Sequence, residues 1–302
     1  MANTIDRRSL LGGLTGLTAT LGLPRKGGAQ SRARITDGQV HIWQAHGDRP
    51  PSASGRQEPL LVEELLATLD ANGVDRVVLV PPSWAARGNT YSLEAAAAYP
   101  DRIRVLGLAG RPAEDQAEAI THWLDTPGMA GLRMFLSNDA GAEYLASGGA
   151  DWLWPILAEN SIPVSVHAGD SLPVLAQAME RHPDLKLCLD AFGLGRNVEA
   201  EEALARFETV ADTMAAFPNV MIKTGVIPRD SGDAFPFSNA QQLVGRVLET
   251  FGPQRLMYAS DMTLLKSPYA EGLEFWRVLP DLPDTDRDAI LGENMNRWLE
   301  WA

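Results

Sequence analysis

Eight short apolar runs alternate with helix-compatible stretches, and this alternation limits the possible folds more than any other feature of the sequence. The runs cover residues 35–42, 75–81, 103–109, 131–136, 163–168, 186–191, 219–226 and 255–260. Nearly continuous apolar runs rich in β-branched residues are typical of parallel strands buried on both faces. Eight strand–helix units therefore predict an α/β fold, a parallel TIM (β/α)8 barrel. A doubly wound sheet is the alternative. Such a sheet usually has a glycine-rich phosphate-binding loop after the first strand, and Gly38 and Gly47 do not form that motif.

The stretches between the runs carry Ala, Leu and Glu at spacings of three to four residues, which favours helices. Predicted helices cover residues 59–71, 92–99, 113–124, 151–159, 172–181, 199–216 and 239–250, and a closing helix covers 284–301. In that closing helix we expect Trp298 and Trp301 to pack on the outside of the barrel, where exposed tryptophans could mark the face of a homodimer.

The size and charge of the chain limit the kinds of partner that it is expected to bind. A length of 302 residues suits one barrel of roughly 250 residues. The net charge of −13 and the lack of a basic block argue against nucleic acid and leave a small molecule as the expected partner. No apolar stretch after residue 30 is long enough to span a membrane. The single cysteine, Cys188, lies in a strand pattern and is predicted to be an inert core thiol.

Residues 1–30 differ from the rest of the chain. Arg7 and Arg8 open a weakly apolar run that extends to Leu23, and small residues follow at 27–29. A charged start, a short apolar stretch and small residues at a cleavage point are typical of an export signal, and the adjacent arginines favour the twin-arginine route. The prediction is a periplasmic protein whose barrel covers residues 33–302. An N-terminal helix or an apolar tail under the barrel is the alternative.

Polar residues recur where the predicted strands end. Asp37, Gln39 and His41 alternate along the first strand and should share one face. His167 and Asp261 end later strands. Because the carboxyl ends of parallel barrel strands build one shared mouth, these groups predict an active site.

Asp261 is the predicted general base, since a carboxylate can take a proton from a water held against a carbonyl carbon. A helix N-cap is the alternative role for a Ser-Asp pair. His41 and His167 could bind a metal, orient the water or donate a hydrogen bond to the carbonyl; alternatively, each is a structural core histidine.

Positive groups are predicted at two further strand ends. Arg133 and Lys223 could bind a carboxylate of the substrate, or they could form an ion pair with Asp190 instead. Gln39 and Asp190 are further substrate-binding candidates, and Arg87 and Arg229, on loops, are secondary ones. The long loops at 46–57 and 228–238 are predicted to form the sides of the substrate site. Asn294 is predicted to cap the terminal helix or to anchor the barrel.

In this order, the motifs resemble the amidohydrolase-related family, in particular its branch of sugar-lactone and pyrone-dicarboxylate lactonases. The resemblance covers residues 33–301. It is carried by Asp37-Gly-Gln-Val-His41-Ile-Trp43, residues 73–80, Leu93-Glu94 with Pro100-Asp-Arg102, Gly131-Leu-Arg133, His167, Asp190-Ala-Phe-Gly193, Lys223, Ser260-Asp261 and Asn294.

Two positions depart from the family pattern. Gln39 stands where the family has the first histidine of its His-x-His motif, and Ala191 stands where the sixth strand often carries histidine. The metal set that the resemblance implies is thus reduced to His41, His167 and Asp261, with Gln39 as an amide-oxygen ligand. We expect either no required cofactor or a weakly held zinc or manganese ion.

The sequence therefore predicts a hydrolase that opens a small lactone bearing carboxylate or hydroxyl groups. One alternative is a metal-dependent amide or ester hydrolase, or a decarboxylase, of the same superfamily. The other is a barrel that has lost catalysis and only binds a small ligand.

Overall fold

The computed structural model describes residue 1 and residues 32–45, 55–195, 198, 200–225 and 232–302. Its barrel unit, Ala33–Ala302, holds one parallel sheet whose eight strands pair in chain order. The strands are β1 Thr36–Val40, β2 Arg76–Leu79, β3 Ile103–Leu108, β4 Met129–Phe135, β5 Val164–His167, β6 Leu187–Leu189, β7 Met221–Lys223 and β8 Leu256–Met257. The predicted TIM barrel is confirmed, and each of the eight predicted runs overlaps a strand.

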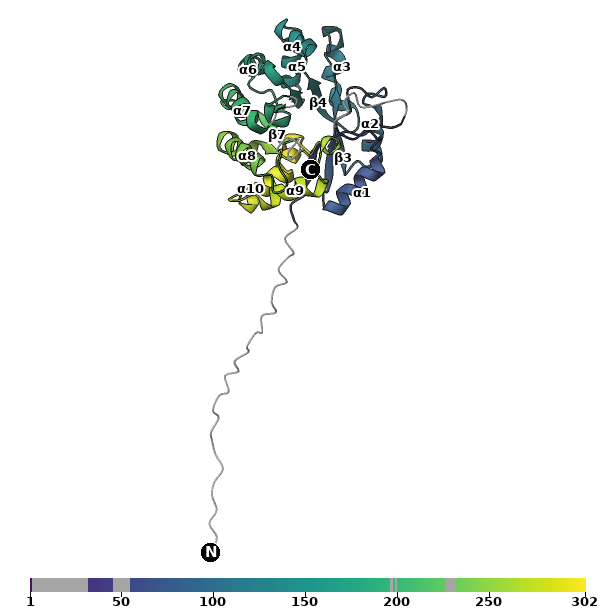
Figure 1. The fold of residues 1–302 in the computed structure, drawn as a ribbon. Helices are drawn as coiled ribbons and strands as arrows, with labels where there is room; N and C mark the ends of the chain where they lie inside the picture. Colours follow the sequence, from purple (N-terminus) through teal and green to yellow (C-terminus); the bar gives the residue numbers. More distant parts are fainter. Residues whose placement is uncertain (2–31, 46–54, 196–197, 199, 226–231) are drawn as a thin grey trace. The chain divides into compact units, whose positions relative to one another are not determined.

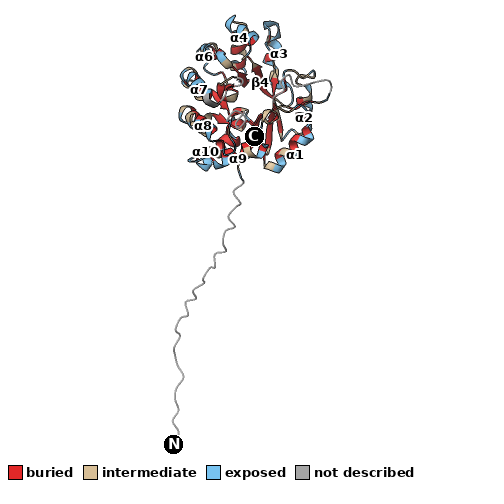
Figure 2. Cartoon of the chain, in the orientation of Figure 1, coloured by how far each residue is buried: buried red, intermediate tan, exposed pale blue. Residues whose placement is uncertain are grey.

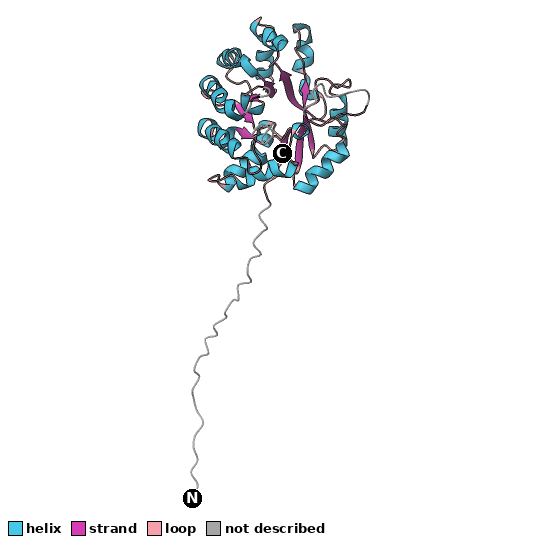
Figure 3. Cartoon of the chain, viewed as in Figure 1, coloured by secondary structure: helices cyan, strands magenta, loops and turns pink. Residues whose placement is uncertain are grey.

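Helices surround the strands (Figures 1 and 3). The α-helices are α1 Val62–Asn72, α2 Thr90–Ala98, α3 Ala117–Thr121, α4 Asp139–Ala146, α5 Leu153–Glu159, α6 Leu172–Arg181, α7 Ala200–Met214, α8 Ser238–Phe251, α9 Tyr269–Val278, α10 Asp284–Asp288 and α11 Asn294–Trp298. Short 3-10 turns cover η1 Glu114–Gln116, η2 Trp123–Asp125, η3 Gly169–Ser171, η4 Ala191–Gly193, η5 Pro253–Arg255 and η6 Met262–Leu264, and η7 Ala289–Glu293 is a π-helical turn. No helix of the described residues is long and apolar enough to cross a membrane.

Four helical regions differ from the prediction. The predicted helix at 113–124 is three short pieces, and the closing helix at 284–301 is divided by the π turn η7. Helix α4 was not predicted, although its start carries a usual signal, because Asn138 Oδ1 accepts a hydrogen bond of 2.8 Å from the Gly141 amide. Helix α9 was also not predicted.

Alternating strand positions face two separate apolar clusters. Outward residues such as Val77 and Leu79 pack beneath the helices, whereas Val78 and Leu106 belong to an inner cluster with Cys188. Figure 2 shows the strands buried and the outer helix faces exposed. Because the inner cluster occupies one layer of the barrel, the next inward positions toward the strands' carboxyl ends form a second layer, and that layer is polar.

The terminal tryptophans do not lie where they were predicted. Trp298 and Trp301 are buried and belong to the inner cluster, and the guanidinium of Arg76 lies 4.5 Å from the centre of the Trp301 ring. The π turn brings this segment in close: the Tyr258 amide donates a hydrogen bond to the Ile290 carbonyl, 2.8 Å away. Exposed tryptophans therefore give no support to a dimer face, and a homodimer stays a prediction.

The first and last strands meet at Gly38. Its amide donates a hydrogen bond of 2.9 Å to the Tyr258 carbonyl, and a side chain at this position would bring a Cβ within 2.7 Å of that oxygen. The Asp261 amide also donates to the Gln39 carbonyl, at 3.0 Å. Only glycine permits so close an approach, and this closure sets the end of β8 beside β1.

Candidate active site

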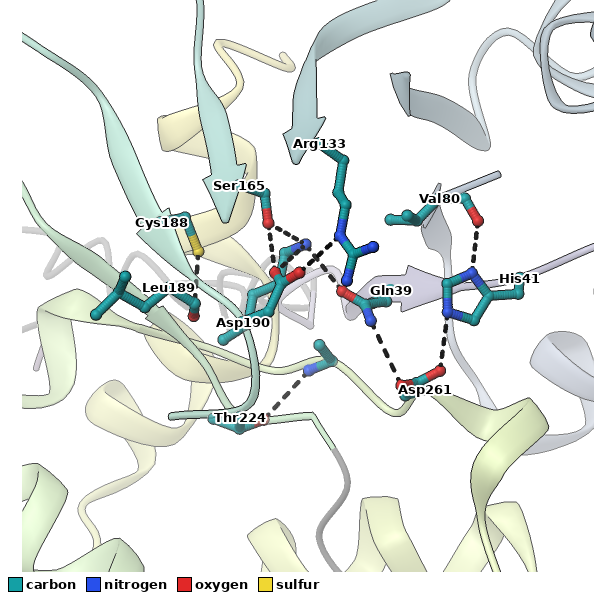
Figure 4. Close-up of polar contacts among 12 residues, drawn as sticks. Gln39, His41, Val80, Arg133, Ser165, Cys188, Leu189, Asp190, Thr224 and Asp261 are labelled. Carbon is teal, nitrogen blue, oxygen red and sulfur yellow. Dashed lines mark hydrogen bonds and ion pairs between the residues drawn. The ribbon is translucent and has the colours of Figure 1, made fainter. Parts of the chain in front are cut away.

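Asp261 follows β8 in a backbone conformation that few residues adopt. Its φ is 46° and its ψ 44°, in the left-handed region, where a residue other than glycine is held at a cost of order 1 kcal/mol. Although it precedes η6, its side chain makes no capping hydrogen bond to that turn. The carboxylate instead faces β1, with Oδ1 3.2 Å from His41 Nε2 and Oδ2 3.4 Å from Gln39 Nε2 (Figure 4).

The hydrogen bonds of His41 determine which ring nitrogen carries a proton. Nδ1 lies 2.6 Å from the Val80 carbonyl, which can only accept, so Nδ1 is the donor. Nε2 then faces the Asp261 carboxylate, and a direct hydrogen bond between them requires Nε2 to be protonated as well. The side chain of His41 is 17% exposed, whereas that of Asp261 is 8% exposed and its Oδ1 is buried.

Asp37 holds the backbone beside Asp261 in place through buried hydrogen bonds. Its carboxylate accepts hydrogen bonds from the Ser260 amide at 2.8 Å, the Ser260 hydroxyl at 2.6 Å and the Tyr269 hydroxyl at 3.1 Å. Burial raises the pKa of Asp37 to about 6, although these donors oppose the shift. Asp37 is fully buried and holds the residue next to Asp261, whereas the alternation had suggested that it would share the site with His41. A register shift in β1 between Asp37 and Val40 interrupts the regular ladder there.

A second cluster lies deeper in the polar layer. Lys223 Nζ lies 3.2 Å from Asp190 Oδ1 and donates a hydrogen bond of 2.9 Å to Ser165 Oγ. Arg133 Nε donates to Asp190 Oδ2 at 3.0 Å, and the Ser165 hydroxyl donates to Asp190 Oδ1. Burial by itself would raise the pKa of Asp190, but Lys223 and Arg133 outweigh it and hold the pKa well below its usual range. Asp190 is therefore an ionised carboxylate between two cations.

Gln39 joins the two clusters. Lys223 Nζ donates a hydrogen bond of 3.2 Å to Gln39 Oε1, while Gln39 Nε2 donates to Asp261 Oδ2. Figure 4 shows the Gln39 amide between Asp190 and Asp261. A chain of polar contacts thus runs from the buried ion pairs to the Asp261 carboxylate.

The two predicted substrate cations differ in where they lie. Lys223 is 1% exposed and sits behind the mouth with Asp190, as the ion-pair alternative expected. Arg133 lies two residues before the end of β4, and its terminal Nη1 and Nη2 groups make no hydrogen bond to any part of the chain that the structure describes. Figure 4 shows its guanidinium directed toward Gln39 and His41. Arg133 thus keeps donors for a ligand.

His167 lies near enough to Asp190 to help lower the pKa of that carboxyl, whereas Arg87 lies on a loop and Arg229 is outside the described residues. His167 ends β5, with Nδ1 2.7 Å from Ser137 Oγ and its ring stacked on Phe135 at 5.0 Å. Arg87 binds both carboxylate oxygens of Glu94 on α2, at 2.6 and 3.0 Å. Arg229, with residues 226–231, and the loop residues 46–54 lie outside the described residues.

Sequence reasoning missed Ser165 and Tyr269. Ser165 carried a usable signal, because it stands two residues before His167 and so shares its face of β5. Tyr269 carried none, since only the return of α9 toward the barrel brings its hydroxyl to Asp37. Asn294 anchors the barrel as predicted, donating to the carbonyls of Pro253 and Leu256 at 2.8 and 2.6 Å.

A carboxylate–imidazole pair lies at the carboxyl ends of the parallel eight-stranded barrel, which is where barrel enzymes have their active sites. The fold and the site therefore place the chain in the class of barrel enzymes. Within that class, the chain belongs to the amidohydrolase family, whose model matches residues 36–301, and it is accordingly a hydrolase. This confirms the family that the motifs predicted.

Solved structures share the barrel fold. An amidohydrolase from Burkholderia multivorans with bound zinc is 25% identical, with a TM-score of 0.75 over 89% of this chain and 99% of that one. A protein from Pseudomonas putida described as a 2-pyrone-4,6-dicarboxylic acid hydrolase is 21% identical, with a TM-score of 0.70 over 89% and 98%. A 5-carboxyvanillate decarboxylase from Novosphingobium aromaticivorans in complex with manganese is 16% identical, with a TM-score of 0.66 over 91% and 97%. The comparison with curated proteins gave no significant match.

Two of these similar structures hold zinc or manganese, so the donor groups of this chain decide whether such an ion fits. Among the described residues, no group of three or more His, Cys, Asp or Glu side chains is placed to hold a metal ion. Of the predicted set, His41 and Asp261 meet, but Gln39 turns its amide NH2, which has no lone pair to offer, toward Asp261. Its oxygen is already bound to the Lys223 ammonium. The residues in this arrangement do not fit a divalent ion.

Proposed function

We propose that this protein hydrolyses the ester bond of a small lactone that carries a carboxylate. The observation that supports this most directly is the pair of Asp261 and His41, 3.2 Å apart at the barrel mouth. A base next to a hydrogen-bond donor is what attack of water on a carbonyl requires. The similarity to a pyrone-dicarboxylic acid hydrolase supports the lactone as the substrate class.

The proposed reaction needs only water and the two side chains. Asp261 takes a proton from water, and the water oxygen forms a bond to the lactone carbonyl carbon. The carbonyl oxygen gains negative charge, which the His41 imidazole stabilises by donating a hydrogen bond from Nε2. The ring C–O bond then breaks, and the leaving oxygen receives the proton held by Asp261. The product is the open hydroxy acid, and Asp261 is again ionised.

Arg133 supplies the recognition of the carboxylate in this proposal. Its Nε is bound to Asp190, which fixes the plane of the guanidinium, and its two terminal nitrogens remain available. A planar fork of donors matches a carboxylate in a bidentate manner. Because the protein as a whole carries a net charge of −13, this local cation is needed to hold an anionic substrate.

The proposal includes no resident metal ion. A strained lactone carbonyl is more electrophilic than an amide, so it needs less polarisation by a Lewis acid. Hydrolysis of amides at comparable rates, or decarboxylation, would instead favour the metal-dependent alternative.

A substrate panel tests the function. We expect the purified protein to open carboxylate-bearing lactones faster than neutral lactones, and both faster than linear amides, as measured by proton release at constant pH. The Arg133→Lys variant keeps a cation beside Asp190 but loses the fork. It should raise KM for carboxylate-bearing lactones roughly tenfold to a hundredfold, as expected for one lost charged hydrogen bond, and leave neutral lactones nearly unchanged.

Two results would contradict this function. The first is saturable, stabilising binding of lactones with no turnover of any panel member, which is the result expected of a ligand-binding barrel without catalysis. The second is an equal KM increase for charged and neutral lactones in Arg133→Lys, which would assign Arg133 a structural role.

Export to the periplasm is also part of the proposal. Its support is the pair Arg7 and Arg8 before an apolar run, in the segment of residues 2–31 that lies outside the described residues. The wild-type protein should be recovered from the periplasm after cell fractionation, and the Arg7→Lys, Arg8→Lys double variant from the cytoplasm. Cytoplasmic recovery of the wild-type protein would reject export.

A further inference from the structure

The ammonium of Lys223 has three acceptors around it and no route to solvent. Gln39 Oε1, Ser165 Oγ and Asp190 Oδ1 lie 3.2, 2.9 and 3.2 Å from Nζ, and the residue is 1% exposed. An ammonium carries three donors and no acceptor, so these three contacts use its full capacity. Lys223 is therefore a fixed charge inside the barrel rather than a group that reaches a substrate.

This fixed charge determines how the Gln39 amide is oriented. Because Lys223 can only donate, the amide oxygen must face it, and the NH2 group must face the other way. On that other side lies Asp261 Oδ2, which as an ionised carboxylate can only accept. The chemistry at both ends thus selects the same orientation of Gln39.

The orientation of the Gln39 amide also affects Asp261, the general base of the proposed function. The Gln39 NH2 holds Asp261 Oδ2, while Oδ1 faces His41 Nε2. A hydrogen bond to an ionised carboxylate stabilises its charge and restricts its rotation. One oxygen of Asp261 is therefore anchored, and the other is directed to the side of the site where His41 lies.

The positive charge of Lys223 also opposes the binding of a metal ion at His41 and Asp261. A cation bound to His41 and Asp261 would lie on the far side of a single amide group from the Lys223 ammonium, and like charges at such short range repel strongly in a buried setting. Coordination by Gln39 Oε1 would also require that oxygen to leave the ammonium, in a layer where Lys223 is enclosed.

We propose that Lys223 and Gln39 together take the place of a metal ion in this site, with Lys223 fixing the Gln39 amide and Gln39 positioning the Asp261 carboxylate. Both are positioning residues, because neither touches the reacting atoms in this arrangement. The kinetic part of this inference rests on the proposed function, since it takes Asp261 as the base. The part that concerns metal binding does not.

Substitutions of Gln39 test the positioning role while leaving Lys223 paired with Asp190 and Ser165. Gln39→Glu keeps the size of the side chain and the contact with Lys223, but it cannot donate to Asp261. We expect kcat to fall roughly tenfold to a hundredfold with KM within about twofold, the loss expected of one charged hydrogen bond. Gln39→His can accept from Lys223 on one nitrogen and donate to Asp261 with the other, so it should lose much less.

The opposite order of activities in these two variants would overturn the positioning role of Gln39. If Gln39 only filled space, the isosteric Gln39→Glu would keep more activity than Gln39→His. A change confined to KM would likewise assign Gln39 to substrate binding.

Zinc titration followed by thermal melting tests the metal part without measuring activity. Zinc should not raise the melting temperature of the wild-type protein or of Gln39→His, because Lys223 remains in both. The double variant Gln39→His, Lys223→Met restores the imidazole and removes the ammonium, so zinc should raise its melting temperature. If zinc stabilises the wild-type protein, or fails to stabilise a folded double variant, the inference is wrong. If the double variant does not fold, the wild-type protein and Gln39→His still decide the matter.

Discussion

Replacing Asp261 with Asn is expected to lower kcat for lactone opening by about 10²- to 10⁴-fold, the range over which general acid–base groups contribute. The amide cannot take a proton from water, although its oxygen can still accept from Gln39 Nε2, which now lies 3.4 Å from the carboxylate. The fold and KM should therefore change little. Steady-state kinetics with a carboxylate-bearing lactone from the panel measures the effect.

A second histidine–aspartate pair provides a matched control. His122 Nδ1 lies 2.8 Å from Asp125 Oδ2 on the protein surface, where both side chains are mostly exposed. Asp125→Asn removes the same kind of contact and should leave kcat unchanged. If Asp261→Asn opens lactones as fast as the parent protein, Asp261 is not the base and the proposed mechanism is wrong.

Replacing Asp190 with Asn is expected to destabilise the fold by about 3–5 kcal/mol, the usual effect of removing one partner from a buried ion pair. Asp190 contacts both Lys223 and Arg133, and all three side chains are buried. Asparagine keeps the shape but leaves two buried cations without their counterion. The shift in the urea unfolding midpoint measures the loss.

The pH dependence of that loss has a definite sign. The pKa of Asp190 is lower in the folded protein than its usual value of 3.8, so ionisation of this group stabilises the fold. Its contribution is complete above the unfolded value and is lost as pH falls from there through the folded pKa. The difference in stability between the parent and Asp190→Asn should therefore be constant near neutral pH and shrink in strong acid.

An exposed ion pair serves as the control for stability. Glu208 binds Arg246 through two hydrogen bonds of 2.8 and 2.9 Å, but both side chains are exposed to solvent. Glu208→Gln should shift the urea unfolding midpoint far less than Asp190→Asn, because solvent screens exposed pairs. Equal losses for Asp190→Asn and Glu208→Gln would show that the buried cluster is not what holds this layer together.

The barrel could be predicted because its signal is repeated along the chain. Each apolar run has the length and composition of a buried strand, and stretches such as residues 77–80 leave no polar face for a half-exposed strand. Boundaries were less certain where a distant segment competes for backbone hydrogen bonds. The last run was predicted to extend to residue 260, but β8 ends at Met257 because the Tyr258 amide bonds to Ile290 in the π turn.

The site was predictable to the extent that it depends on strand alternation. His41 and Asp261 were placed at one mouth because parallel strands all end on the same side, and the structure brings them within 3.2 Å. Asp37 follows the same alternation yet serves a different purpose, since Tyr269 and Ser260 surround it. Neither partner of Asp37 could be inferred from the residues that flank it.

The amino-acid order by itself determined the barrel, the family and the strand ends from which the polar groups emerge, because these follow from local periodicity and from motifs along the chain. Only the tertiary structure decided that Lys223 faces Asp190 and Gln39 rather than the mouth, while Arg133 keeps donors for a ligand. The two cations have similar sequence surroundings. Their roles diverge because the depth of each side chain within the barrel, and hence its counterion, depends on how eight distant strands align in register.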